Sequence, residues 1–196
     1  MLRDSQNWYI VNTFRTMKAS KYLFPVLILL AACNPQRKEP TVDKGMSMYD
    51  SVYVTADIQW HQQYYPLLDR QVFSIDLLNE GLSFDSAHHI VGTGLNLYLS
   101  DILLPMTDTC LKEGCYQMDT TAAPYTFLPY KYFEGNITGC YLLDIEENQI
   151  QRIIGFTAGQ MQIEYISEED IRLDLLLYTA DSTRYHATYQ GPTLYQ

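Results

Sequence analysis

Residues 161–189 read MQIEYISEEDIRLDLLLYTADSTRYHATY, and the alternation in this stretch decides the fold. Apolar and polar side chains take turns in residues 161–165 and again in residues 171–175. Successive side chains of a strand point to opposite faces, so a period of two predicts strands with one buried face. The short polar segment 179–182 separates the second strand from residues 184–189, which predicts a hairpin.

The same period of two recurs towards the N-terminus, in residues 52–60, 71–77 and 95–101. Residues 146–154 are compatible with either a short helix or a strand. The chain therefore predicts an all-β fold, a single antiparallel β-sandwich or open-barrel domain in residues 49–196. In the first of these strands we expect one buried face, formed by Val52, Val54, Ala56, Ile58 and Trp60.

The sequence MKASKYLFPVLILLAA at residues 17–32, followed by Cys33, predicts a lipoprotein signal peptide. Two lysines precede an apolar run of 11 residues, whereas a membrane-spanning helix needs about 20. The order Leu30-Ala31-Ala32-Cys33 matches a bacterial lipobox, in which small residues fit the peptidase and the cysteine thiol takes the diacylglycerol. We expect lipidation of Cys33, with acyl chains such as palmitate that contribute about 0.8 kcal/mol per buried methylene. The alternative is a plain secretory signal with a chance cysteine.

The segments on either side of the signal peptide have different characters. Residues 1–16 carry Asp4 and a mixed polar composition that is unlike a signal peptide, so we interpret them as a misassigned upstream start. Residues 33–48 are polar, with Pro35 and Pro40, and predict a flexible tether between the lipid and the domain.

The chain is acidic, with a formal net charge of −10. Four of the 13 basic and one of the 23 acidic residues precede Cys33, so the processed chain carries a charge of −13. Such a surface argues against nucleic acid as a partner and against close contact with anionic headgroups.

Three cysteines follow Cys33, and an extracytoplasmic location permits disulfides. Cys110 and Cys115 flank a four-residue loop, so a bridge between them is one possibility. The other is a bridge from Cys140 to one of them, and either choice leaves one thiol over. The spacing lacks the paired cysteines of a zinc site.

Several stretches carry a resemblance: the lipobox, residues 92–101, the Gly114-Cys115-Tyr116 strand start, and the C-terminal strands in residues 159–165 and 171–195. By these the chain resembles the small, largely uncharacterised β-rich lipoproteins of Bacteroidota. The resemblance implies a β-sandwich-like fold in the cell envelope and no activity. It departs at Asp181-Ser182, where such hairpins turn on Asp-Gly. By analogy, Asn34 after the lipidated cysteine favours the outer membrane, with the periplasmic or surface face left open.

A metal site would need histidines to converge, and His61, His88, His89 and His186 fall on different predicted segments. His88 and His89 are neighbours whose rings point apart in an extended chain. We therefore expect no metal site and interpret these histidines as surface or loop residues.

Other chemistry has equally little support in the sequence. No Gly-x-Ser-x-Gly elbow or phosphate-cradling glycine loop is present, and Gly92-x-Gly94 is too short for the latter. Carboxylate pairs for glycoside hydrolysis can be drawn, but a chain with this many acids always supplies them. We expect no catalytic residues and no cofactor.

Tyrosine is unusually frequent, with 17 in the chain, and offers an apolar ring with a hydroxyl for sugars or peptides. Its preference for half-buried strands explains the same frequency without a ligand. The exposed candidates are Tyr64, Tyr65, Tyr125, Tyr130, Tyr132, Tyr185, Tyr189 and Tyr195.

Bacteroidota O-glycosylate an Asp-Ser/Thr pattern that occurs four times in this chain. Its possible acceptor residues are Ser51, Ser86, Thr120 and Ser182.

Taken together, the sequence predicts a non-enzymatic envelope lipoprotein that is a binding or structural accessory, with a glycan or protein as ligand. The first alternative is a β-barrel carrier of a small apolar ligand, which requires a dry interior pocket. The second is an envelope hydrolase, which requires converging acids or histidines.

Overall fold

The computed structural model describes residues 48–65 and 69–195, and every regular element in them is a strand. The predicted signal peptide, Cys33 and most of the tether lie outside the described residues. No helix of the described residues is long and apolar enough to cross a membrane. The strands are β1 (Met48–Tyr53), β2 (Thr55–Tyr65), β3 (Arg70–Leu78), β4 (Leu82–Phe84), β5 (Ile90–Gly92), β6 (Gly94–Pro105), β7 (Gly114–Met118), β8 (Thr126–Phe127), β9 (Lys131–Phe133), β10 (Asn136–Thr138), β11 (Cys140–Glu146), β12 (Gln149–Gly155), β13 (Ala158–Tyr165), β14 (Asp170–Tyr178) and β15 (Arg184–Tyr195).

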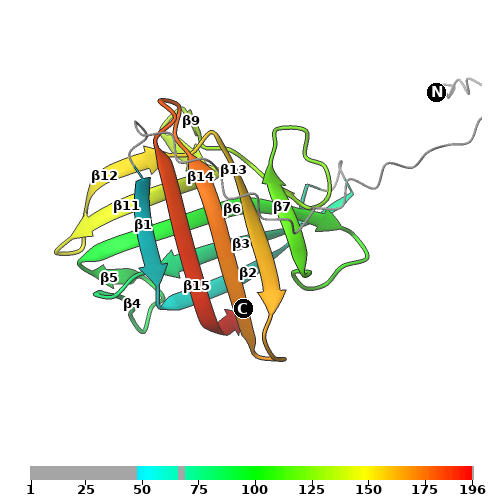
Figure 1. Cartoon of the computed structure of the whole chain (residues 1–196), viewed down its shortest axis with the longest axis horizontal. Coiled ribbons are helices and arrows are strands. Elements are labelled where there is room, and N and C mark those ends of the chain that lie inside the picture. Colours follow the sequence, from blue (N-terminus) through cyan, green and yellow to red (C-terminus); the bar gives the residue numbers. More distant parts are fainter. Residues whose placement is uncertain (1–47, 66–68, 196) are drawn as a thin grey trace, which may run out of the picture. The chain divides into compact units, whose positions relative to one another are not determined.

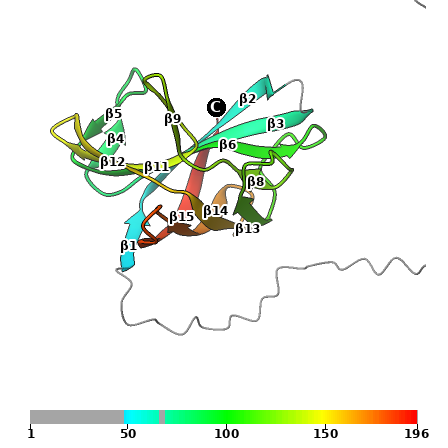
Figure 2. The same ribbon diagram turned by 90° about the horizontal axis from the view of Figure 1, so that it is seen from above.

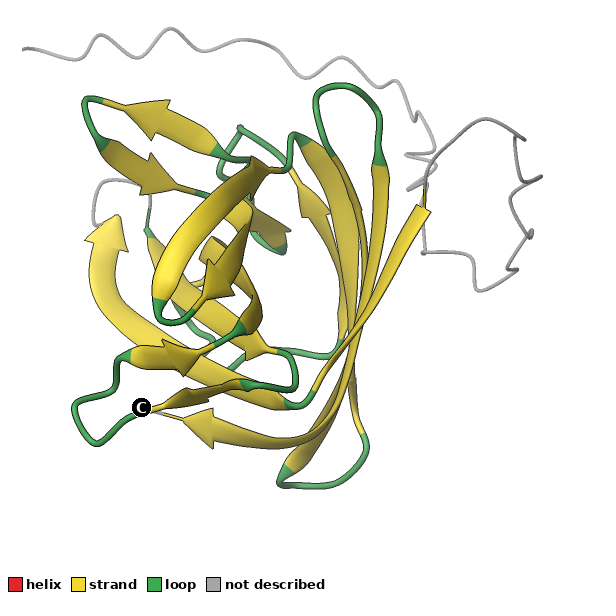
Figure 3. Cartoon of the chain, turned by 90° about the vertical axis from the view of Figure 1, so that its left-hand side faces the viewer, coloured by secondary structure: helices red, strands yellow, loops and turns green. Residues whose placement is uncertain are grey.

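Eight of these strands close into a barrel, in the order β6-β3-β2-β15-β14-β13-β7-β8 and back to β6 (Figures 1 and 3). The all-β prediction is confirmed, and the barrel is closed where the sequence suggested a sandwich or an open barrel. Closure depends on the length of β6. Its first half pairs with β11 along residues 94–99, and its second half pairs with β8 at Ile102 and Leu103.

The first and last strands of the domain are parallel neighbours, although the sequence suggested antiparallel pairing throughout. β1 pairs with the first half of β15, and β2 pairs with its last residues. The register slips by one residue between the two, because Tyr53 faces Tyr189 whereas Ala56 faces Thr193.

This slip overturns part of the predicted buried face. Ala56 and Ile58 are buried as expected, but Val52 and Val54 are 71% and 56% exposed. Tyr53, expected on the opposite face, is 3% exposed and belongs to the core. A one-residue irregularity exchanges the two faces of a strand because the side-chain period is two.

The barrel interior is filled by side chains. Phe73, Tyr116, Phe127, Phe156 and Tyr189 are its bulkiest members, and each is at most 2% exposed. The strands predicted from residues 71–77, 95–101, 161–165 and 171–175 contribute their expected apolar faces to this core. Segment 146–154, left open between helix and strand, forms most of strand β12.

Two small hairpins lie outside the barrel, above the layer formed by β2, β3, β6 and β11 (Figure 2). The β4–β5 hairpin connects β3 to β6 and folds back over them, burying Leu78, Leu82 and Ile145 in a second, smaller core. Gly92 (φ +117°) permits this return, because a Cβ there would collide with the carbonyl oxygen of Gly81. The β9–β10 hairpin precedes β11 and borders the same face.

Candidate binding groove on the outer face of the barrel

The outward side chains of β2, β3 and β6 are mostly polar, yet several of them, including Asp57, Ser74 and Asn96, are buried. Their neighbours in sequence, such as Ile58, Ile75 and Leu97, point into the barrel, which places the alternate residues outside. The strand register aligns one outer row across four strands: Asp57, Asp76, Tyr98 and Tyr141.

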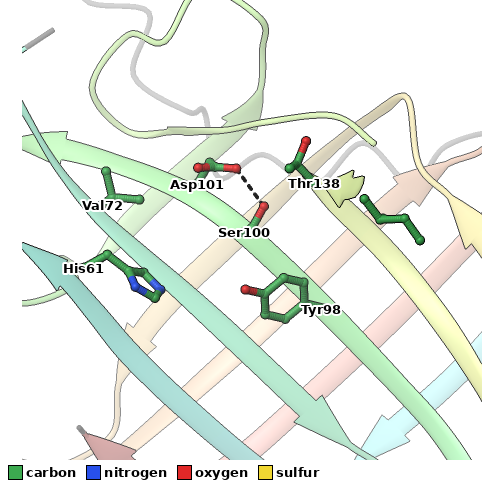
Figure 4. A pocket seen from close by; sticks show the side chains of 7 residues that line it. His61, Val72, Tyr98, Ser100, Asp101 and Thr138 are labelled. Atoms are coloured by element: carbon green, nitrogen blue, oxygen red, sulfur yellow. Dashed lines mark hydrogen bonds between the residues drawn. The ribbon is translucent and has the colours of Figure 1, made fainter. Parts of the chain in front are cut away.

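A groove of about 220 Å³ opens on this face beneath the β9–β10 hairpin. Its apolar wall comes from Val72 and Ile137, and its polar lining comes from β2, β6 and β10 (Figure 4). The polar lining residues are His61, Tyr98, Ser100, Asp101 and Thr138.

A β-bulge aims Asp101 at this groove. Phe73 pairs with Ile102 and Ile75 pairs with Leu99, so Ser100 and Asp101 together face the single residue Ser74. Asp101 has a left-handed backbone (φ +56°), a conformation that concentrates at functional sites. Its carboxylate is 6% exposed and accepts a hydrogen bond from Ser100 Oγ at 2.7 Å (Figure 4).

Ser100 is held from the other side by the backbone that leads into β11. The Gly139 N–H donates to Ser100 Oγ at 2.7 Å, and the Ser100 N–H donates to the Gly139 carbonyl. This hydroxyl therefore donates one hydrogen bond and accepts another, which fixes the wall of the groove at Asp101.

His61 and Ser74 stand on neighbouring strands with Nε2 and Oγ 2.9 Å apart. A serine hydroxyl hydrogen-bonded to an imidazole is the arrangement that activates serine as a nucleophile in enzymes. Here Ser74 is only 1% exposed, so its hydroxyl is enclosed beneath the groove, whereas His61 lines it. The contact orients the imidazole towards the groove.

Asp57 and Asp76 face each other directly across β2 and β3. Asp57 is 0% exposed, and its Oδ2 accepts from Gln59 Nε2 and His88 Nε2, each at 2.9 Å. Asp76 accepts from Asn96 Nδ2 at 2.9 Å. Burial and the charge of Asp57 raise the pKa of Asp76 to about 6, against the lowering influence of Asn96 and His88.

His88 reaches Asp57 from the tip of the β4–β5 hairpin. It has a left-handed backbone (φ +63°), and its ring stacks on Phe84 with centroids 4.4 Å apart. Asp85 shapes this tip, because its Oδ1 accepts from the backbone N–H groups of Ala87 and His89. The hairpin is thus connected to the acid pair by one defined contact.

The β9–β10 hairpin, which lines the groove through Ile137 and Thr138, also carries exposed aromatic rings. Tyr132 and Phe133 are 61% and 60% exposed at its tip, and the Lys131 Nζ lies 6.0 Å from the centre of the Phe133 ring. Tyr130, just before it, packs edge-on against Tyr141 with centroids 6.5 Å apart. Rings of this kind offer apolar faces to a ligand that protrudes from the groove.

The other tyrosine candidates are dispersed. Tyr125 is exposed, and Tyr185 is half-buried in a stack with Tyr49. The prediction that Tyr189 is exposed is wrong. Tyr189 is 2% exposed and belongs to the core, because it faces inward beside Tyr53. The side chains of Tyr64, Tyr65 and Tyr195 lie outside the described residues.

The four Asp-Ser/Thr motifs differ in setting. Ser86, Thr120 and Ser182 are exposed at turns, and in each turn the preceding aspartate accepts from the N–H two residues further on. Ser51 is half-buried within β1. O-glycosylation at these four positions stays a prediction.

Cys110, Cys115 and Cys140 are thiols in the structure. Cys110 is exposed and Cys115 half-buried, whereas Cys140 points into the barrel core, where burial strongly raises the pKa of its thiol. A Cys110–Cys115 disulfide stays a prediction.

The histidines share no common site. His61 and His88 both reach the outer face of the sheet, while His186 lies between Asp50 and Asp174 at 3.0 and 3.2 Å, and His89 is exposed beside Asp85. In the part of the chain that the structure describes, no group of three or more His, Cys, Asp or Glu side chains is arranged to hold a metal ion.

Sequence reasoning missed the acid pair, Ser100 and Asp101. One available signal was the recurrence of polar residues at alternate positions of β2, β3 and β6, on the side opposite the predicted buried face of each strand. Comparisons of the chain with protein-family models, with curated proteins and with solved structures found no match. The candidate site therefore rests on its own geometry.

Proposed function

We propose that this chain is a lipid-anchored, non-enzymatic binding protein of the bacterial envelope whose outer groove takes the end of a neutral glycan. The observation that carries the proposal is the groove itself. It combines an apolar wall at Val72 and Ile137 with the hydrogen-bonding groups of His61, Asp101 and Thr138.

A pyranose ring has the complementary chemistry, with an apolar face of C–H groups and an edge of hydroxyls. The cavity of about 220 Å³ suits one such ring. The exposed Tyr132 and Phe133 lie on the hairpin that borders the groove, where they suit a second sugar. The net charge of −10 disfavours an anionic glycan.

The closed barrel also agrees with the alternative of a carrier for a small apolar ligand. A carrier of that kind holds its ligand inside, yet the barrel interior is occupied by Phe73, Tyr116, Phe127 and other buried side chains. The groove on the outer face is therefore the better-supported site.

Titration of neutral oligosaccharides into the full chain, followed by calorimetry, tests the binding proposal. Asp101→Asn and His61→Ala should each weaken binding by about 10- to 100-fold, the usual cost of losing a hydrogen bond to a charged group. Asparagine tolerates the left-handed backbone at position 101, so the bulge should persist. Asp144→Asn, which removes the same charge from a partly exposed ion pair with Arg152, is the matched control.

Three outcomes would contradict the proposal: no neutral glycan binds, the two groove variants bind as the parent does, or the glycan is cleaved.

The lipid anchor is tested separately. Cys33→Ala should release the protein from the membrane fraction, because the acyl chains are lost. Protease treatment of intact cells then separates a surface domain, which is digested, from a periplasmic one, which is protected.

A further inference from the structure

The pairing of Asp57 with Asp76 destabilises the fold when both carboxyl groups are ionised. Directly opposed residues of neighbouring strands have Cβ atoms about 4.5–5.5 Å apart, and like charges at that distance repel. Asp57 is 0% exposed and Asp76 is half-buried, so water screens this repulsion poorly.

One oxygen of the pair has no hydrogen-bond partner. Asp57 Oδ2 accepts from Gln59 and His88, but no donor in the described residues reaches the buried Oδ1. A buried acceptor without a partner is destabilising, because it loses its hydrogen bonds to water and gains none in the protein. Asp76 is the residue directly opposite Asp57 in the strand register, and its carboxyl group, when protonated, is a donor on the same outer face.

The charged and titratable groups that face the pair come from three further elements. His88 approaches from the β4–β5 hairpin, Tyr98 stands beside Asp76 on β6, and Tyr141 follows on β11. Asn96, also on β6, is neutral and donates to Asp76. None of these groups is a lysine or arginine, so no permanent cation among them balances two carboxylates.

We propose that Asp57 and Asp76 share one proton, and that this proton determines how firmly the β4–β5 hairpin is held against the sheet. The proton sits on Asp76 and is donated to Asp57 Oδ1, while Asp57 Oδ2 keeps its bonds to Gln59 and His88. Loss of the proton leaves two buried carboxylates, which gain hydration when the hairpin moves away. The inference is independent of what the groove binds.

The sign of the effect follows from the shift at Asp76. Its pKa is raised from 3.8 to about 6, mainly by burial, so the closed form binds the proton more tightly than an open, hydrated form. Raising the pH through this interval therefore favours opening. The ratio of the two proton affinities limits the change in opening to about a hundredfold.

Hydrogen exchange of the full chain between about pH 4.5 and pH 7.5 tests this. After correction for intrinsic rates, the amides of β4 and β5 should lose up to about thirtyfold of their protection at the higher pH, because an open form with the ordinary aspartate pKa is already mostly ionised at pH about 4.5. The β9–β10 hairpin in the same samples should not change. Asp76→Asn should markedly reduce the pH dependence of the protection of β4 and β5 and leave only the contribution of the His88–Asp57 contact, whereas Asp144→Asn should behave as the parent does.

Carbon-13 titration of the aspartate carboxyl groups in the parent chain keeps the test decisive if Asp76→Asn does not fold. A shared proton predicts that the carboxyl carbons of Asp57 and Asp76 both respond to the same titration step, the one in which Asp76 loses its proton near its raised pKa of about 6. Separate transitions near the ordinary value for aspartate would overturn the proposal. So would a rise in protection of the hairpin on adding Ca²⁺ at pH about 7.5, because a cation would then hold the pair.

Discussion

The inner and outer faces of strands β2, β3 and β6 are both shielded from water, but they are built from opposite chemistry. The inner face carries Ile58, Ile75 and Leu97, which need only close packing. The outer face carries Asp57, Asp76 and Asn96, whose polar atoms need hydrogen-bond partners once the β4–β5 hairpin covers them.

The difference shows that burial has two origins in this fold. The inner face is buried by the curvature of the barrel itself, so every strand contributes to it. The outer face is buried by an insertion of 15 residues between Leu78 and Gly94, whose His88 contacts Asp57 and whose Leu82 packs against Leu78 and Ile145. Substitutions on the two faces should therefore differ in size, in pH dependence and in which part of the molecule responds.

Phe73→Ala should produce the largest loss of stability. The ring is 1% exposed in the barrel core, and such truncations cost about 3–5 kcal/mol because a cavity remains. Ser74→Ala, the next residue on the outer face, should cost only about 1 kcal/mol through its bond to His61. Urea unfolding of the two variants measures the contrast, and equal losses would mean that the outer layer is as important for stability as the core.

Asp76→Asn should stabilise the protein at neutral pH. A folded-state pKa of about 6 against 3.8 unfolded means that ionised Asp76 costs up to about 3 kcal/mol, a cost that appears as the pH rises from about 4 to 6 and persists above. The parent should therefore lose stability through that window, and the variant should lose less. Unfolding free energies at pH about 4.5 and 7.5 check this; a parent that gains stability over the same interval would refute the sign.

Gly92→Ala should displace the β4–β5 hairpin at a cost of about 1–3 kcal/mol. The added Cβ meets the Gly81 carbonyl and the residue has φ +117°, so both collision and strain contribute. Gly135→Ala at the β9–β10 turn is the control, because it has φ +87° but no atom within 4 Å of the new Cβ. If both variants lose the same stability in urea, strain alone explains Gly92 and the close return of the hairpin is unimportant.

Arg172→Ala should have the smallest effect, below about 1 kcal/mol. Arg172 pairs with Glu164 at 3.0 Å across β14 and β13, and both side chains are about half exposed. Thermal unfolding in low and high salt should differ little between this variant and the parent. A large loss would show that an uncovered outer face can contribute as much as the covered one.

Much of the fold was predictable because its signal is local. The alternation in residues 161–165 and 171–175 predicted β13 and β14 with their buried faces, and the polar segment 179–182 predicted the turn into β15. The same reasoning failed at Val52 and Tyr53, because a register slip between β1 and β2 is set by pairing with the distant strand β15.

The site was less predictable than the fold. Asp57 lay at a polar position of the predicted strand 52–60, and alternation makes such positions look solvated on any strand. His61 was interpreted as a surface or loop residue, whereas β2 extends through it to Tyr65. Asp101 owes its place to a bulge, and no local pattern marks which residue of a strand will be the extra one.

By itself, the sequence determined the all-β class and the alternation of strands, since these follow from side chains two residues apart. The tertiary structure decided which polar residues are buried, that the barrel closes between β6 and β8, and that Asp57 faces Asp76. These features depend on contacts between residues 19 to 25 positions apart and on a hairpin folding back, and the free energy of such contacts exists only once the strands have assembled.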